Sequence, residues 1–167
     1  TSSWFDGGSN RGIIKLFADG TLDDDFAPYG ELSSANFYDI ELDSLGRIYV
    51  GGSMQFSDSS RTILIRITSA GEFDTTFSPQ LPENGSISCL QILLDGRLLV
   101  AGSFTGDRED FALVDANGNL VESFDIGSGA NSWIRGIHLL APNKLYTHGS
   151  FSQIQNQARN GVARITL

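Results

Sequence analysis

The sequence predicts an all-β fold, and three observations support this prediction. Short runs of alternating or continuous apolar residues recur along the 167-residue chain, as is typical of strands. Gly, Asn and Asp residues separate these runs, which is typical of hairpin turns. The pattern also repeats, because Gly52, Gly102 and Gly149 follow one another at steps of 50 and 47 residues. Short antiparallel strands repeated in fours at such a period indicate the blades of a β-propeller.

Each repeat contains four strand-like runs, which in the first complete copy are residues 37–42, 47–53, 63–68 and 73–77. The first and third runs alternate or are continuously apolar, and the second is rich in Val, Ile and Tyr. Tight turns that contain Gly join the first run to the second and the third to the fourth. No window shows a helical period, so we expect no helix.

We expect the whole chain to form a single propeller segment of about three blades plus partial ones. The repeats are approximately 1–26 (partial), 37–77, 87–124 and 133–167 (partial), within a segment that spans residues 1–167. Closed propellers usually need at least about four blades, so the chain is either an open segment of a larger propeller or is completed by oligomerisation. A β-sandwich is the main alternative, but it would not require the same turns to return at a fixed period.

Two stretches of the repeat resemble a known family. They read GRIYVGGS at residues 46–53 and IRITSAGEFDTTF at residues 65–77, and they resemble the delta-60 repeat of bacterial β-propellers. The resemblance covers nearly the whole chain and implies a propeller fold without a shared enzymatic activity. Because these repeats occur mainly in large surface or secreted bacterial proteins and in some phage proteins, it also implies an extracellular, cell-surface or virion location. The third copy departs from the pattern, with Leu113 where the others have Arg or Lys.

The composition excludes several classes of function. The net charge is −9 and the pI is about 4.5, and no Lys/Arg patch is visible, which argues against a nucleic-acid partner. No apolar run is long enough to span a membrane. Cys89 is the single cysteine, so an internal disulfide framework and a cysteine-rich zinc site are excluded. We therefore expect no cofactor, no nucleic acid and no membrane span.

Long connections are expected on one face of the disc. In an up-and-down meander, the connections between second and third strands share a face with the connections between blades, and here both sets are long and varied. Because function usually lies on such loops, we expect a ligand to bind on this loop face. The alternative is that the loops only pack against neighbouring domains. These loops are residues 54–62, 105–110 and 152–161 within blades, and 27–36, 78–86 and 125–132 between blades.

Four residues are the candidates for ligand binding. Trp133 opens a first strand beside the loop face, with Asn131 and Arg135 close in sequence, and Trp4 is the other tryptophan. An aromatic ring beside hydrogen-bonding groups is typical of sugar or peptide recognition. The alternative is that Trp133 packs between blades.

Other recurring residues have a structural interpretation. Arg11, Arg61 and Arg159 precede each third strand, with Arg108 as an approximate fourth, and we expect them to bond between blades. Two sets of Phe residues recur in the same way and are expected in the core; they are Phe26, Phe77 and Phe124, and Phe56, Phe104 and Phe151.

Catalytic and metal sites are weakly indicated. The run Asp23–Asp25 could offer calcium ligands, but alternation along a strand would point its carboxylates to opposite faces. His138 and His148 are too few for most zinc sites and fall within predicted strands. A catalytic pairing of Cys89 with His138 stays open as an alternative, because the first strands of propeller blades line the central channel. No acid partner and no oxyanion-binding group accompanies this pair in the sequence. We therefore predict that the chain is not an enzyme and holds no metal.

The sequence thus predicts a non-catalytic structural, scaffolding or interaction module of a large bacterial surface protein or a virion appendage such as a tail fibre. Its expected partners are proteins or other blades of the same assembly. The alternative is a lectin-like adhesin, with carbohydrate binding to a cell-surface glycan, or protein binding, through the loop face.

Overall fold

The all-β prediction is confirmed. The computed structural model describes residues 13–26, 32–104, 111–124, 127–141 and 144–166, which form strands, bridges and turns without any α-helix. Within this part of the chain no helix is long and apolar enough to cross a membrane.

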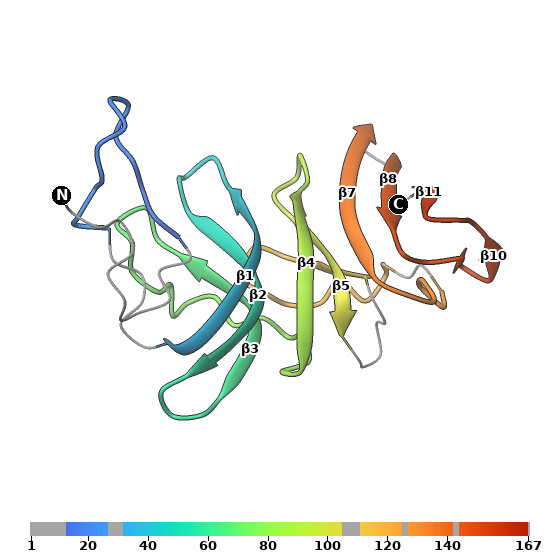
Figure 1. Ribbon diagram of the computed structural model, residues 1–167, viewed down its shortest axis with the longest axis horizontal. Helices are drawn as coiled ribbons and strands as arrows, with labels where there is room; N and C mark the ends of the chain where they lie inside the picture. The colour runs from blue at the N-terminus through green and yellow to red at the C-terminus, as the bar shows by residue number, and fades with distance from the viewer. Residues whose placement is uncertain (1–12, 27–31, 105–110, 125–126, 142–143, 167) are drawn as a thin grey trace.

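Three three-stranded antiparallel sheets stand side by side in chain order, and they do not close into a ring (Figure 1). We call them blades 1, 2 and 3. Blade 1 contains β1 (Leu32–Leu42), β2 (Ile48–Phe56) and β3 (Arg61–Ile67). Blade 2 contains β4 (Gly85–Ile92), β5 (Leu98–Phe104) and β6 (Phe111–Val114). Blade 3 contains β7 (Ile134–Ala141), β8 (Lys144–Gly149) and β11 (Val162–Thr166), with the short hairpin β9 (Gln153–Ile154) and β10 (Gln157–Ala158) between the last two.

The fourth run of each repeat is present as a single bridge rather than as a strand. Phe73 bridges Ile67 in blade 1, and Leu120 bridges Val114 in blade 2. In blade 1 the carboxylate of Asp74 accepts hydrogen bonds from the Thr76 N–H at 3.0 Å and from the Thr76 hydroxyl. These hydrogen bonds turn the chain directly after Phe73, so the pairing of the fourth run with β3 does not continue beyond the one bridge. The segment at residues 13–26, here called the N-terminal hairpin, repeats the geometry with the bridge of Leu16 to Leu22.

Glycines mark the hairpin turns as predicted, because they carry positive φ angles that other residues rarely adopt. The angles are 84° at Gly20, 74° at Gly46, 90° at Gly71, 84° at Gly96 and 96° at Gly118. The glycines that define the repeat have a different role. The first strand of each blade (β1, β4 or β7) is here called its inner strand. A Cβ at Gly52, Gly102 or Gly149 would collide with a backbone carbonyl in, or directly before, the inner strand of the same blade, so only Gly allows this close approach.

A bulge interrupts each inner strand at the same place. The register shifts lie between Phe37 and Asp39 in β1, between Ile87 and Cys89 in β4, and between Ile134 and Gly136 in β7. Beyond the bulge, alternate residues point toward the following blade or toward the preceding blade. We call these two sides of a blade its leading face and its trailing face.

Apolar side chains fill the space between successive blades. The interface of blades 1 and 2 joins Tyr49 and Leu64 to Leu90 and Val100. The interface of blades 2 and 3 joins a second set, which includes Leu99, Ala101, Phe111, Leu145 and Ile165. A third cluster packs Ile13 and Phe26 of the N-terminal hairpin against blade 1. The predicted core Phe residues are confirmed; Phe26, Phe77, Phe104 and Phe151 are buried, and Phe56 and Phe124 pack against the clusters.

Hydrogen bonds also cross between the inner strands of neighbouring blades. The Asp39 carboxylate of β1 accepts a hydrogen bond from the Leu90 N–H of β4 at 2.8 Å. The Ser88 hydroxyl of β4 donates to the carbonyl of Ile134 in β7. Stacking is therefore specified by polar as well as apolar contacts.

Some predicted loops are shorter than expected. Strands β2 and β3 extend into the predicted loop 54–62 and leave a four-residue turn, residues 57–60. Strand β1 likewise begins at Leu32, inside the predicted loop 27–36, and the predicted loop 152–161 contains the β9–β10 hairpin. The predicted loop 105–110 lies outside the described residues.

Candidate interaction surface

The structure brings three of the four predicted site residues together at the start of β7. The segment that contains them runs alongside residues 149–155, with the Gln155 N–H donating to the Gly129 carbonyl at 2.8 Å. The carboxamide oxygen of Asn131 accepts hydrogen bonds from the N–H groups of Ser152 and Gln153, both at 3.0 Å. Its amide nitrogen donates to the Ser152 hydroxyl at 3.0 Å. Asn131 therefore holds this surface in place and has little capacity left for a ligand.

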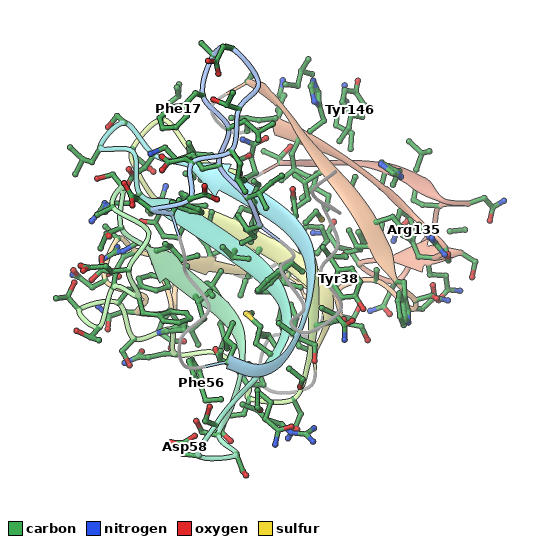
Figure 2. The ribbon with its side chains drawn as sticks, turned by 60° about the vertical axis from the view of Figure 1, so that its left-hand side comes forward. Phe17, Tyr38, Phe56, Asp58, Arg135 and Tyr146 are labelled. Carbon is green, nitrogen blue, oxygen red and sulfur yellow. The ribbon has the colours of Figure 1, made fainter. Side chains whose placement is uncertain are left out.

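Trp133 and Arg135 present the groups that a ligand could contact. The Trp133 carbonyl accepts a hydrogen bond from the Ser150 N–H at 2.8 Å, which anchors the backbone while the residue remains 56% exposed. Within the described part of the chain, the Trp133 side chain does not pack between two blades. The Arg135 Nε donates to the Ser150 hydroxyl at 3.2 Å, and its side chain lies on the outside of blade 3 (Figure 2). Trp4 lies outside the described residues.

Cys89 is part of the core rather than a nucleophile beside His138. Its sulfur lies 3.9 Å from the Ala101 carbonyl oxygen, within the interface of blades 2 and 3. Burial raises the pKa of the Cys89 thiol to about 12, so the reactive thiolate is not formed near neutral pH. His138 is exposed on β7. The geometry therefore gives no support to a Cys–His catalytic pair.

The carboxylates of the run Asp23–Asp25 are not gathered around a common point in the described structure. The Asp23 carboxylate forms an ion pair with Lys15, at 2.7 Å between Oδ2 and Nζ. Asp24 and Asp25 are exposed. No group of three or more potential metal-ligating residues occurs in the described ranges of the chain.

The arginine that links two blades is not among those predicted. Arg61 is exposed, and Arg159 donates to the carbonyl of the adjacent Ala158 at 2.7 Å. Arg11 and Arg108 lie outside the described residues. Arg66 is instead buried, and its guanidinium donates to the carbonyl of Ala116 in the blade 2 turn.

Four further groups surround the Arg66 guanidinium. Nε pairs with Asp74 at 2.8 Å, and the two Nη atoms donate to the Tyr49 hydroxyl at 3.2 Å and the Thr76 hydroxyl at 3.3 Å. The guanidinium carbon also lies 4.6 Å from the centroid of the Phe77 ring, within cation–π range. The Thr76 hydroxyl, followed by Arg66, holds the pKa of Asp74 below its usual value despite an opposing effect of burial.

A signal in the sequence could have identified Arg66. A cation is followed eight residues later by an aspartate in two copies, as Lys15 with Asp23 and Arg66 with Asp74. In the third copy both positions are apolar, as Leu113 and Val121, which pack together in the interface of blades 2 and 3. Such paired replacement within one chain indicates a structural ion pair rather than a ligand site.

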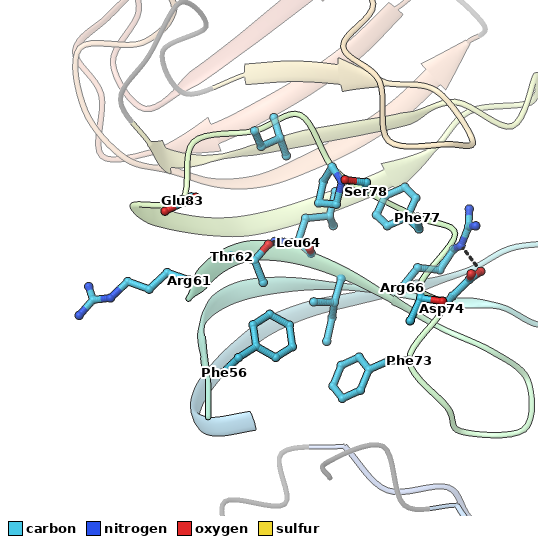
Figure 3. Close-up of a pocket in the computed structure, with 14 residues that line it drawn as sticks. Phe56, Arg61, Thr62, Leu64, Arg66, Phe73, Asp74, Phe77, Ser78 and Glu83 are labelled. Carbon is cyan, nitrogen blue, oxygen red and sulfur yellow. Dashed lines mark hydrogen bonds and ion pairs between the residues drawn. The ribbon is translucent and has the colours of Figure 1, made fainter. Parts of the chain in front are cut away.

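A groove of about 330 Å³ lies on the outer edge of blade 1 (Figure 3). It lies between β3 and the connection that leads to blade 2. Phe56 and Phe73 contribute rings whose centroids are 5.9 Å apart, and Arg61 and Glu83 add charged groups. Arg66 and Asp74 also line it, but they are paired with each other. The groove is therefore lined by both aromatic and polar side chains.

Comparison with known proteins agrees with this architecture. The chain matches a family described as a domain of unknown function (DUF5122) beta-propeller, over residues 1–26, 46–77 and 93–120. These segments, which make up just over half of the chain, contain turns and strands of successive repeats. No curated protein and no solved structure shows significant similarity to the chain. The chain therefore belongs to the DUF5122 beta-propeller family.

Proposed function

We propose that the chain is a non-catalytic structural or scaffolding module of a large bacterial surface protein or virion appendage, built of delta-60-type repeats. The observation that carries this proposal is the role of Arg66. Its buried guanidinium joins blade 1 to the Ala116 carbonyl of blade 2, so the most deeply buried cation of the described chain serves blade stacking. A buried guanidinium that is bonded across the interface opposes sliding of one blade against the next.

Other polar and reactive groups support the same proposal. Asp39 and Ser88 form hydrogen bonds between inner strands of neighbouring blades. The one thiol is held protonated by burial, and the Asp23 carboxylate is paired with Lys15. In the described residues these groups stabilise the stack and are not arranged around a common reaction centre.

Immunogold electron microscopy tests the location and role. Antibodies raised against the chain would be applied to intact cells that express the parent protein, and to purified phage particles if the gene lies in a prophage. We expect label on the cell envelope or on the particle, and an antibody preadsorbed with the chain serves as the control. Label confined to the cell interior would refute the proposal.

A lectin-like adhesin is the second candidate, because Trp133 and Arg135 are both exposed and Ser150 forms a hydrogen bond with each of them. Such a surface can stack on a sugar ring while the cation bonds its hydroxyl groups. A glycan array with the full chain tests this candidate. Trp133→Ala should abolish binding, whereas Tyr38→Ala, a matched aromatic that is 58% exposed on blade 1, should preserve it. An array without binding, or binding that survives Trp133→Ala, eliminates the candidate.

A further inference from the structure

Three Asn-Gly pairs occur in the chain, at residues 84–85, 117–118 and 160–161. In such a pair the backbone nitrogen of Gly can attack the side-chain carbonyl carbon of Asn, because Gly has no Cβ to hinder the approach. The attack is fastest when no other group holds the Gly nitrogen. All three Asn residues are exposed, so exposure alone does not distinguish the three pairs.

Two of the three Gly nitrogens are held by hydrogen bonds within turns. The Gly118 N–H donates to the carbonyl of Asp115 at 3.0 Å. The Gly161 N–H donates to the carbonyls of Phe151 and Arg159, at 2.8 and 3.0 Å. These hydrogen bonds must break before either nitrogen can turn toward the side chain of the preceding Asn, so the fold protects both pairs.

The Gly85 nitrogen, by contrast, lies at the free edge of blade 2. Gly85 begins β4, which is an edge strand of its sheet, and the next residue, Ser86, pairs with Ser103 of β5. The equivalent pair in blade 3 is hydrogen-bonded from the Ser150 N–H to the Trp133 carbonyl. Hydrogen-bonded and non-hydrogen-bonded pairs alternate along an antiparallel ladder, so Gly85 occupies a non-hydrogen-bonded position and its N–H points away from β5.

The Asn84 side chain is also unrestrained, because Asn84 forms no hydrogen bond within the described part of the chain. Gly is required at the next position, since Gly85 has a φ angle of 114° and a Cβ there would collide with the carbonyl oxygen of Ser103. The fold therefore requires Gly beside Asn84 and leaves both reacting groups of this pair free to meet.

We propose that the fold selects Asn84 for spontaneous deamidation, with water as the only co-reactant. The Gly85 nitrogen loses its proton to solvent and bonds to the Asn84 Cγ, and the carboxamide nitrogen leaves as ammonia. Water then opens the resulting succinimide at one of its two carbonyls, which gives aspartate or isoaspartate at this position. Either product adds a negative charge beside the exposed Glu83. This modification goes beyond the structural role proposed above.

Peptide mapping by mass spectrometry tests this site on the full chain after incubation at mildly alkaline pH. We expect Asn84 to deamidate about tenfold faster than Asn117 and Asn160, which is the factor that corresponds to breaking one backbone hydrogen bond. A methyltransferase specific for isoaspartate should label the incubated chain, and Asn84→Gln should remove most of this label, because Gln forms its larger ring more slowly. Circular dichroism should show that Asn84→Gln keeps the fold, since the substituted side chain is exposed.

Unfolding separates the effect of the fold from that of the local sequence. In concentrated urea the hydrogen bonds of Gly118 and Gly161 are lost, so the deamidation rates of the three pairs should converge. Equal rates in the folded chain would overturn the proposal, because the free edge would then give the Gly85 nitrogen no advantage. A preference for Asn84 that is equally large in urea would also overturn it, because the local sequence and not the fold would set the rate.

Discussion

The buried ion pair of Arg66 and Asp74 offers the sharpest test of how the blades are held together, because the chain itself contains its apolar replacement. In blade 2, Leu113 and Val121 occupy the equivalent positions and pack in the next interface. The backbone geometry is the same in both copies, since the Asp74 N–H donates to the Arg66 carbonyl and the Val121 N–H donates to the Leu113 carbonyl, both at 2.9 Å. The set of variants is therefore Asp74→Val, Arg66→Leu and the double variant.

The single variants should be destabilising because each leaves a charge without its partner. Asp74→Val leaves the guanidinium of Arg66, whose side chain is 3% exposed, with only neutral acceptors, and should cost about 3 kcal/mol in free energy of unfolding. Arg66→Leu leaves the Asp74 carboxylate partly solvated and still bonded to Thr76, so we expect a smaller loss of about 2 kcal/mol.

The double variant should recover most of this loss. Replacing both partners with apolar groups removes the unpaired charge, and Ala116, whose carbonyl loses its partner, is an exposed residue at which water can take the place of Arg66. The Tyr49 hydroxyl still loses its partner, so a deficit of about 1 kcal/mol remains. The double-mutant cycle should therefore give a coupling energy of about 4 kcal/mol.

Urea unfolding at pH 7, followed by far-UV circular dichroism, measures these differences if the m-value is the same for all variants. Chain concentration is held constant across the variants. Additive single effects, or a double variant less stable than both single variants, would refute the view that the ion pair is replaceable by packing.

Three further outcomes follow from the same contacts. Gly102→Ala should destabilise the fold by about 3 kcal/mol or more in urea unfolding, because its Cβ would collide with the Ser86 carbonyl. Gly96→Ala is the control and should cost less, because its φ angle is strained but its Cβ would meet no neighbouring atom. Asp39→Ala should cost about 1–2 kcal/mol, measured in the same way, by leaving the Leu90 N–H unpaired, and Asp39→Asn should retain most of the stability because its amide oxygen still accepts. The free energy of unfolding, measured in urea across a pH series, should fall as pH drops below about 4. The pKa of Asp74 is held below its usual 3.8, so the unfolded state binds the proton first, and the stabilisation present above pH 4 is lost as pH falls through the native pKa. An acid profile unchanged in Asp74→Val would contradict this assignment.

Much of the fold could be predicted from the sequence because its signals are local. The turn glycines with positive φ, the alternation of apolar residues and the return of the Gly-Ser motif each depend on neighbouring residues. The fourth strand was predicted less well. Its residues have a strand-like pattern, but the Asp74 carboxylate competes for the backbone and turns the chain after one bridge.

The arrangement of the candidate residues follows from the sequence only in part. Asn131, Trp133 and Arg135 do lie together, as their spacing suggested, but Asn131 is occupied by the N–H groups of Ser152 and Gln153. These partners lie 21 and 22 residues away, beyond any local pattern. Arg61 recurs in the sequence yet is exposed, whereas Arg66 is buried, because burial depends on the neighbouring blade rather than on recurrence.

By itself, the sequence determined the period, the positions of the turns and the membership in a repeat of antiparallel strands, since hydrogen bonds between adjacent strands connect residues close along the chain. The tertiary structure alone decided which face of each blade is covered. That choice depends on contacts between residues about fifty positions apart, such as Leu90 with Asp39 and Ala116 with Arg66. Tyr49 and Leu99 are therefore core in blades 1 and 2, whereas the equivalent Tyr146 of blade 3 is exposed, because burial requires a neighbouring blade and not only an apolar sequence.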